Sequence, residues 1–541
     1  MRRSRTPKWL IALGAIAGIG GIALAILGMR ISPIVREKAI EVLEERYQSK
    51  VELADLTVNL FPRISVMGRG LVLRHHGRTD VPPLVKIRKF TAHAALAGLL
   101  NKPMHVGEVT LEGLELHMPP RKGGLQPVKP TIAPAHLAPP KEAPPEDPPP
   151  PDANTVKGST VLVIDHIHAD GAILRVLPKV PGKDPLEFNI QKLFLRSVGK
   201  DRPLEFEATL TNPKPPGLIQ SKGHFGPWQN TEPGYTTVDG HYTFSKADLG
   251  VFNGIGGILS SEGNYNGRLN RIHVVGNTDT PDFVVRTGGH PVHLKTRFDA
   301  VVDGTDGDTY LQPVEANFLK TSLLCRGAVA HQPGVSGKYV ILDIVMQKGR
   351  IEDLLRLAVK GDDPIMRGPA QLQTKFLLPP GSADVMERLQ LEGRFGVVSG
   401  HFTSSAVHTK VAELSARSRG KPKMADELGE DPNSIASDLK AIVVYKNAAV
   451  RFSQLSFRVP GAEVRLAGSY GLRSEAMDFH GVLSMQAKVS PTMTGWKSWM
   501  LRAADPFFTK KGGGSEVAIH ISGTRTKPSF GLDLFGKQKK K

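Results

Sequence analysis

The stretch "AAVRFSQLSFRVPGAEVRLAGSYGL", residues 448–472, contains the pattern that decides the fold. Its two halves alternate between apolar and polar residues and are separated by Pro-Gly. Alternation with a period of two, interrupted by a turn signal, is typical of two half-buried strands joined by a hairpin. In the second half Val464, Leu466 and Tyr470 share one face, and charged residues occupy the other. The stretch therefore predicts antiparallel strands with one apolar and one polar face.

Two later stretches repeat this alternation. Their apolar positions are Phe479, Leu483, Met485 and Val489 in residues 478–489, and Val517, Ile519 and Ile521 further on. The sequence leaves two explanations open for these faces. They close on one another as the core of a β-sandwich, or they line a curved sheet whose apolar groove holds lipid chains. In the second case these seven residues and the three above are the predicted groove lining.

Short strand patterns fill most of the remaining chain, punctuated by many of its 56 Gly and 42 Pro. They predict a mainly β fold, an elongated and curved antiparallel sheet, and disfavour a doubly wound enzyme. Roughly 30 strands spaced ~4.8 Å apart would give a sheet of at most ~140 Å. Short helices are predicted at 32–48, with Ser32 as its cap, and at 90–101, 351–360, 385–390, 407–419 and 493–508.

The N-terminus predicts a membrane anchor. "MRRSRTPK" carries four cations and is followed by the uncharged run "WLIALGAIAGIGGIALAIL", residues 9–27, which is long enough to cross a bilayer as a helix. The preceding cations favour a cytoplasmic N-terminus with the bulk of the chain on the other side. A cleaved signal peptide is disfavoured because its candidate site, "ALA" at 23–25, lies inside the apolar run. The predicted anchor residues are Trp9, Leu10, Ile11, Leu13, Ile16, Ile19, Ile22, Leu24, Ile26 and Leu27.

The composition limits the kinds of partner and site that the chain can have. The net charge of +18 favours anionic lipid surfaces, since no nucleic-acid recognition motif accompanies it. Cys325 is the single cysteine, so an intramolecular disulfide or a Cys-rich zinc site is excluded. Residues 119–153 are crowded with proline and have no apolar period, which predicts an extended linker or insertion.

One stretch resembles a metal site. In "DHIHADG", residues 165–171, His166, His168 and Asp170 fall on one face of a strand, as in the start of a metallo-hydrolase signature. That signature continues with a further histidine where Gly171 stands, and two histidines without a third ligand do not make a catalytic zinc site. We therefore predict no metal and no other cofactor.

An internal repeat explains this stretch better. Placing Gly171 over Gly113 aligns Ile167 with Val109, Asp170 with Glu112 and Leu174 with Leu116. Both copies then predict a strand, an acidic-Gly turn and a second strand. A similar recurrence links "HVVGNTDTPDF", residues 273–283, with "IHISGTRTKPSF", residues 519–530, where we predict a strand that ends in a Gly-Thr turn.

Catalytic motifs are missing from the chain. "DGTDGD", residues 303–308, begins like a calcium loop but has Val314 where the bidentate carboxylate is needed, so it predicts a hairpin turn. The sequence contains no P-loop, no Gly-x-Ser-x-Gly elbow and no dinucleotide-binding fingerprint. We therefore predict a protein without enzymatic activity.

Several stretches together resemble the AsmA-like family of bacterial envelope proteins. They are "HVGEVTLEGLEL" at 105–116, "GRFGVVSGHFTSSAVHTKVAELSARSRG" at 393–420, the opening stretch at 448–472 and "IHISGTRTKPSF" at 519–530. The family is related to TamB and to the eukaryotic chorein-type bridge proteins that transfer lipids. The resemblance covers most of the chain outside the Pro-rich segment and rests on packing and turn patterns.

The resemblance implies a single-pass inner-membrane protein with its bulk in the periplasm and a taco-shaped β-groove that conducts phospholipids in outer-membrane biogenesis. The implied partners are the membrane, phospholipids and outer-membrane or other envelope proteins, and no catalytic residues are implied. Two alternatives remain: an assembly factor for outer-membrane proteins without lipid transfer, and an exported metallo-hydrolase centred on His166 and His168. The predicted segments are a cytoplasmic N-terminus (1–8), the anchor (9–29), an α+β region (30–118), the linker (119–153), a central β region (154–350), a C-terminal β region (351–536) and a basic tail (537–541).

Overall fold

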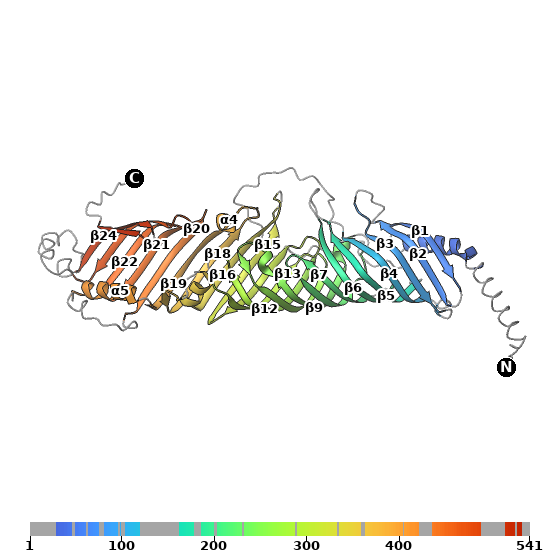
Figure 1. Cartoon of the computed structure of the whole chain (residues 1–541), viewed down its shortest axis with the longest axis horizontal. Helices are drawn as coiled ribbons and strands as arrows, with labels where there is room; N and C mark the ends of the chain where they lie inside the picture. The colour runs from blue at the N-terminus through green and yellow to red at the C-terminus, as the bar shows by residue number, and fades with distance from the viewer. Residues whose placement is uncertain are drawn as a thin grey trace, which may run out of the picture.

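The computed structural model of the chain consists mainly of β-strands (Figure 1). It describes residues 27, 29–45, 49–60, 63–74, 81–95, 98, 103–118, 162–177, 185–199, 203–229, 232–286, 289–332, 335–358, 363–403, 405–420, 435–487, 514–524 and 527–532. The predicted anchor residues Trp9 to Ile26, the Pro-rich segment, the predicted helix at 493–508 and Val489 lie outside these ranges. In the described part of the chain, no helix has both the length and the apolar character needed to span a membrane.

The strands cover the chain from residue 50 to residue 532. They are β1 (Lys50–Asn59), β2 (Ile64–Arg74), β3 (Val85–Ala94), β4 (Met104–Met118), β5 (Leu162–Val176), β6 (Leu186–Val198), β7 (Leu204–Pro213), β8 (Pro216–Phe225), β9 (Thr237–Asp248), β10 (Ile255–Gly256), β11 (Ile258–Arg268), β12 (Arg271–Val285), β13 (Val292–Val302), β14 (Thr309–Phe318), β15 (Thr321–His331), β16 (Lys338–Arg350), β17 (Met366–Arg367), β18 (Pro369–Leu378), β19 (Gln390–Phe402), β20 (Ser437–Lys446), β21 (Ala449–Val459), β22 (Ala462–Gly471), β23 (Ala476–Met485), β24 (Ser515–Thr524) and β25 (Lys527–Leu532). The helices are one at 29–45, α3 (Ile351–Ala358), α4 (Val385–Arg388), α5 (Ser405–Ser418) and the 3-10 turns η2 (Pro233–Tyr235) and η3 (Leu249–Val251).

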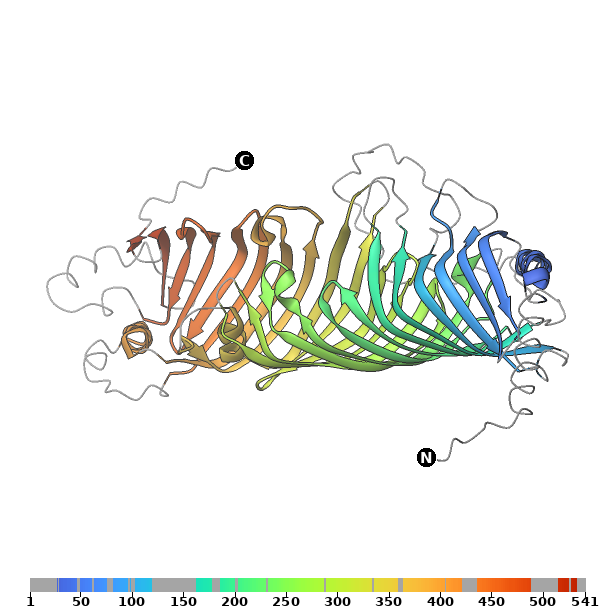
Figure 2. The same cartoon turned by 45° about the vertical axis from the view of Figure 1, so that its right-hand side comes forward.

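All 25 strands belong to one sheet, which curves along its length and does not close (Figures 1 and 2). The two-residue strands β10 and β17 pair with the ends of β12 and β19. The other strands each pair with the next one along the chain, from β1 at one end to β25 at the other. The predicted mainly β, curved antiparallel sheet is confirmed, and the described residues form 25 strands, where roughly 30 were predicted for the chain. At ~4.8 Å per strand the sheet is about 105 Å long.

One neighbouring pair departs from the antiparallel rule. β4 and β5 are parallel, and Val109 lies opposite Ile167, Glu112 opposite Asp170 and Leu116 opposite Leu174. This register is the alignment that the internal repeat predicts, so the two copies lie side by side. A parallel pair needs a crossover connection, and the Pro-rich segment is part of the chain that joins the two strands.

Several predicted turns lie inside continuous strands. Gly113 has φ of +65° and lies within β4, and Gly171 lies within β5, so the acidic-Gly turns predicted for the two repeat copies are wrong. Gly70 in β2 has the same left-handed φ of +65°, and the pairing keeps one register across it, from Arg69 opposite Lys89 to Leu71 opposite Ile87, so the strand continues through the glycine without a bulge. Gly171 repeats this arrangement in β5, with φ of +69°.

Two further predictions are wrong because the residues concerned belong to continuous strands. The helix predicted at 90–101 is wrong in its first part, because Phe90 to Ala94 belong to β3. Phe90 lies opposite Gly68 and fills the space that a side chain there would need, which favours the strand. The recurring phrase at 273–283 lies inside the single strand β12, so it contains no turn, whereas its counterpart continues from β24 into β25.

The N-terminal helix covers the free edge of β1. Val58 N–H donates to Ser32 Oγ over 2.9 Å, Arg36 Nε donates to the carbonyl of Leu53 over 2.9 Å, and Val51 N–H donates to Glu44 Oε1 over 3.0 Å. Ser32 lies within this helix and is not its cap, since the helix begins before it. The helices predicted at 351–360, 385–390 and 407–419 are confirmed as α3, α4 and α5.

Candidate functional site

The predicted lining residues of the last strands lie on one face of the sheet. Val464 pairs with Leu483, which pairs with Val517. Phe479 pairs with Ile521, and Leu466 and Ile519 both pair with Gly481. Directly paired residues project to the same side of a sheet. By alternation Tyr470 and Met485 share this side, which we call the apolar face.

The apolar face runs without interruption from β1 to β25. Starting from Val58, the chain of directly paired residues is Val58, Val66, Ala92, Val109, Ile167, Leu195, Phe206, Gly223, Gly240, Tyr265, Val274, Ala300, Leu311, Gly327, Leu342, Phe376, Leu391, Tyr445, Val450, Tyr470, Met477, Gly523 and Pro528. No member of this path is charged. The apolar face therefore spans the entire width of the described sheet.

The opposite face, which we call the polar face, has a different composition. The row next to that path runs Thr57, Met67, Thr91, Thr110, His168, Phe194, Glu207, Lys222, His241, Asn264, Val275 and Asp299. Ion pairs cross this face between neighbouring strands, for example Lys89–Glu112 at 2.7 Å and Arg175–Glu187 at 2.8 Å. Such a surface can face water, since exposed ion pairs are stable without being buried by other parts of the protein.

Among the residues that the structure describes, three helices cover parts of the apolar face. The N-terminal helix packs Val35 and Ile40 against Leu53, Leu56 and Val58 of β1. The helices α3 and α5 also pack on this face. α3 packs Leu354 and Leu355 on a buried cluster with Met346 and Val397, and α5 packs Val411 and Ala412 on Val459 and Ala462.

No second sheet stacks on the apolar face within the described ranges, because their strands all belong to one layer. The two-sheet sandwich that the sequence left open is therefore not formed by these strands. Of the predicted lining residues, Val517 is buried, and Leu466, Leu483 and Ile519 are half-buried. On the polar face of the same strands, Arg465, Ala467, Ser469, Asp478 and His480 are exposed, whereas the polar-face side chains of β24 are half-buried.

The histidines of "DHIHADG" lie on the polar face and do not converge on a metal. His168 Nε2 is 3.7 Å from Glu108 Oε1, and its ring centroid is 4.5 Å from that of Phe194. His166 stacks on the same phenyl ring at 5.7 Å, and Asp170 lies opposite Lys192. Of the described residues, none completes a three-ligand group with this pair.

Two other groups do bring three candidate ligands together. The first joins His331 with Asp306 and Asp308 of the "DGTDGD" segment, which forms the β13–β14 hairpin turn as predicted. Asp308 accepts from His331 Nδ1 at 2.7 Å and lies 3.5 Å from Lys338 Nζ. Burial acts to raise the pKa of Asp308, but these contacts outweigh it and hold the pKa below its ordinary value.

The second group is Asp478, His480 and His520 on the polar face of β23 and β24. The Oδ1 atom of Asp478 lies 3.2 Å from His480 Nε2 and 3.1 Å from His520 Nε2. Sequence reasoning missed this group because His520 comes from another strand. The available signal was Asp478 and His480 two residues apart in an alternating strand, which places both on one face.

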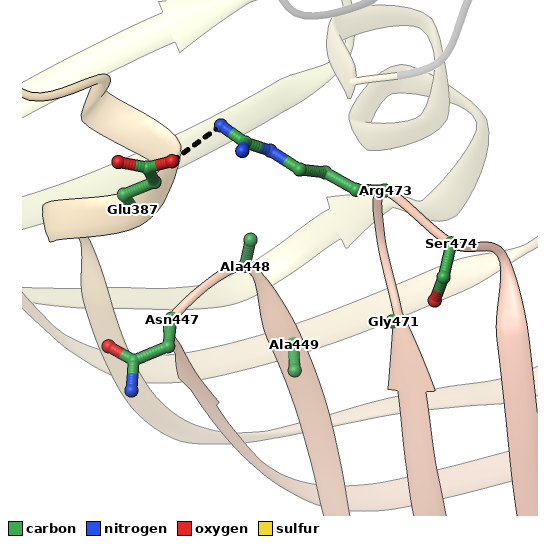
Figure 3. Close-up of a pocket in the computed structure, with 7 residues that line it drawn as sticks. All are labelled: Glu387, Asn447, Ala448, Ala449, Gly471, Arg473 and Ser474. Atoms are coloured by element: carbon green, nitrogen blue, oxygen red, sulfur yellow. Dashed lines mark ion pairs between the residues drawn. The ribbon is translucent and has the colours of Figure 1, made fainter.

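A pocket of about 530 Å³ lies between the hairpin ends of β20–β21 and β22–β23 and the helix α4 (Figure 3). Arg473 extends toward Glu387 and forms an ion pair at 2.8 Å across its mouth. Its remaining lining residues are Asn447, Ala448, Ala449, Gly471 and Ser474. They include no base beside the Ser474 hydroxyl, so they do not form the nucleophile–base pair of a hydrolase.

Comparison with known proteins gives no relative. No family model, curated protein or solved structure matches this chain. The function must therefore be inferred from the two faces of the sheet.

Proposed function

We propose that the apolar face binds phospholipid acyl chains and guides them along the sheet, as a groove that shelters them from water. The observation that supports this most is the uncharged path of paired residues from Val58 to Pro528. A folded core needs only local apolar clusters, whereas a lipid path needs apolar side chains on every strand. No catalytic group is part of this proposal, which describes a protein without enzymatic activity.

The driving force is the removal of apolar surface from water. Each methylene that an acyl chain buries contributes about 0.8 kcal/mol, so several methylenes hold a chain on half-buried residues such as Leu466 and Ile519. A headgroup must stay in water or meet a polar partner, because burying it unpaired is costly. The open long edge of the curved sheet would leave the headgroup outside while the tails lie inside.

The proposed setting is the bacterial envelope. An N-terminal anchor at 9–29 would hold the chain in the inner membrane, with the sheet in the periplasm. There the sheet would receive phospholipids from the membrane and serve outer-membrane biogenesis together with other envelope proteins. At about 105 Å the sheet offers a path several times longer than one lipid, so several lipids would bind along it.

The test is site-specific photo-crosslinking in the full chain. A photoreactive residue replaces Leu466 or Ile519 on the apolar face, or Ala467 as the matched control on the polar face of the same strand. After irradiation in vesicles, phospholipid adducts are measured by mass spectrometry. We expect adducts at 466 and 519 and at most a trace at 467.

Equal labelling of both faces, or none at 466 and 519, would contradict the proposal. In that case the apolar face is a core, and an assembly factor for outer-membrane proteins becomes the better explanation. Co-purified outer-membrane protein that crosslinks at the same positions would support this alternative directly.

A further inference from the structure

We propose that Asp478, His480 and His520 form a binding site for a divalent transition-metal ion such as Zn²⁺. The three side chains lie on the polar face near the C-terminal end of the sheet. His480 and His520 are directly paired across β23 and β24, and Asp478 precedes His480 by two residues on the same side. This site is separate from the apolar face and independent of any lipid.

The arrangement of the ligand atoms fits a metal ion. The two imidazole rings are stacked, with centroids 4.1 Å apart and planes 6° apart. Both Nε2 atoms point at one carboxylate oxygen, at 3.2 Å and 3.1 Å. Ligands about 2.0–2.1 Å from Zn²⁺ at tetrahedral angles are about 3.3 Å from one another. The spacing of the ligand atoms therefore suits one ion, and binding requires the two parallel imidazole rings to rotate so that their Nε2 lone pairs converge on it, which needs no change in the strands.

The neighbouring residues leave the three ligands accessible, and no lysine or arginine among the described residues pairs with the carboxylate of Asp478. The paired neighbours of the two histidines are Ala467 on β22 and Gly531 on β25, which are too small to cover the rings. The row that contains Asp478 continues with Ser469 and Ser522. Among the described residues, the ion-pair partners of Asp478 are the two histidines and no lysine or arginine. A cation between the three ligands would neutralise this carboxylate.

Other histidines on the sheet form simpler pairs. His224, His273 and His293 each meet one aspartate, with distances of 2.8–2.9 Å. In the group of Asp306, Asp308 and His331, the ammonium of Lys338 lies 3.5 Å from Asp308 and supplies the positive charge that a metal would bring. Asp478 therefore differs from these carboxylates by having two imidazoles and no competing cation.

The ligand chemistry limits the kind of metal. Imidazole nitrogen favours Zn²⁺, Ni²⁺ or Cu²⁺, whereas Mg²⁺ and Ca²⁺ prefer sites made of oxygen alone. Three protein ligands leave further coordination positions to water or to Ser522 Oγ. The ion would tie β23 to β24, two strands that are separated by 29 residues of chain. Because the imidazoles must be deprotonated to bind, acidification weakens the site.

The experiment is a titration of the full chain with ZnCl₂, using detergent-solubilised protein that carries no polyhistidine tag. Isothermal titration calorimetry measures stoichiometry and affinity, and X-ray absorption at the zinc edge identifies the ligands. We expect one tightly bound Zn²⁺ with two imidazoles in its shell. His480→Ala and His520→Ala should each weaken binding at least about tenfold, and Asp478→Asn should weaken it as well.

His273→Ala is the matched control, since it removes a polar-face histidine that meets one aspartate on neighbouring strands. Unchanged zinc affinity in this variant is expected. Zinc binding that survives in the double variant His480→Ala/His520→Ala, or no binding by the wild-type chain at 50-fold excess Zn²⁺ over protein, overturns the proposal. Circular dichroism verifies that each variant keeps its strands, which is expected because Asp478 and His480 are exposed and His520 is half-buried.

Discussion

The apolar and polar faces of the sheet are made by alternate residues of the same strands, yet they are held together differently. On the apolar face, side chains from neighbouring strands pack on one another, and three short helices cover limited parts of it. On the polar face, charged residues and histidines form pairs across the strands. Consecutive residues of a strand therefore lie in different environments. Substitutions at two consecutive positions separate the contribution of the apolar face to stability from that of the polar face.

The largest difference is expected at residues 397 and 398. Val397 is fully buried beneath α3, whereas Val398 points to the polar face and is 49% exposed. Val397→Asp buries an unpaired carboxylate and should cost about 3–5 kcal/mol, whereas Val398→Asp should stay within about 0.5 kcal/mol. Long arrays of strands unfold locally, so hydrogen exchange of β18 to β20 is the appropriate measurement. Similar protection in both variants would show that α3 does not cover this face.

The next comparison is between Leu466 and Ala467. Leu466 is half-buried, so Leu466→Asp should cost about 1–3 kcal/mol and reduce the uptake of a fluorescent phospholipid from vesicles at least about tenfold. Ala467→Asp should change neither property, because position 467 is exposed on the polar face. Uptake that is normal in folded Leu466→Asp protein would contradict the proposed lipid path.

A third, smaller effect concerns pH and Asp308. Its pKa is lowered in the folded chain, so its contribution to stability is present above its ordinary pKa and disappears as the pH falls through the folded value. Asp308→Asn should therefore destabilise the hairpins around His331 by about 1–3 kcal/mol at pH 7 and by much less near pH 2. Urea unfolding followed by circular dichroism at both pH values measures this. An equal loss at both values would mean that the charge of Asp308 contributes nothing.

The smallest effect is expected for the exposed ion pair between Glu387 and Arg473. Such a pair contributes less than about 1 kcal/mol, because water screens it and both side chains lose freedom. Glu387→Gln, Arg473→Gln and the double variant form a cycle that isolates the coupling. Thermal unfolding in low and high salt should show a coupling that shrinks with salt. A large coupling would indicate that this ion pair orders α4 against the hairpins.

Much of this fold could be predicted from the alternation of apolar residues. The face shared by Val464, Leu466 and Tyr470 follows from a period of two, and the register of β4 on β5 follows from the internal repeat. Glycines were the main source of error. Gly70 and Gly113 indicate a break in regular backbone, but a glycine in the left-handed conformation occurs in turns and also inside continuous strands. Only the pairing of the neighbouring strand decides between them.

The candidate sites also depend on strand pairing, which the sequence pattern does not give. Alternation places Phe479, Leu483 and Ile519 on apolar faces of their own strands, and only the cross-strand registers show that these faces are one surface. The group of Asp478, His480 and His520 depends on the pairing of two strands that are distant in sequence. Spacing within one strand predicts two of its members and cannot supply the third.

The parallel pair of β4 and β5 has a consequence for how the chain folds. Because the two strands carry the same pattern of apolar and acidic residues in register, β5 is a near-equivalent substitute for β4 beside β3. Nine residues separate β3 from β4, but 67 separate it from β5, so the wrong pairing costs about 2 kcal/mol more in loop entropy. The shorter loop therefore favours the correct hairpin of β3 and β4. The order of synthesis favours it as well, since β4 emerges before β5. Shortening the segment between β4 and β5 would erode this advantage and increase mispairing.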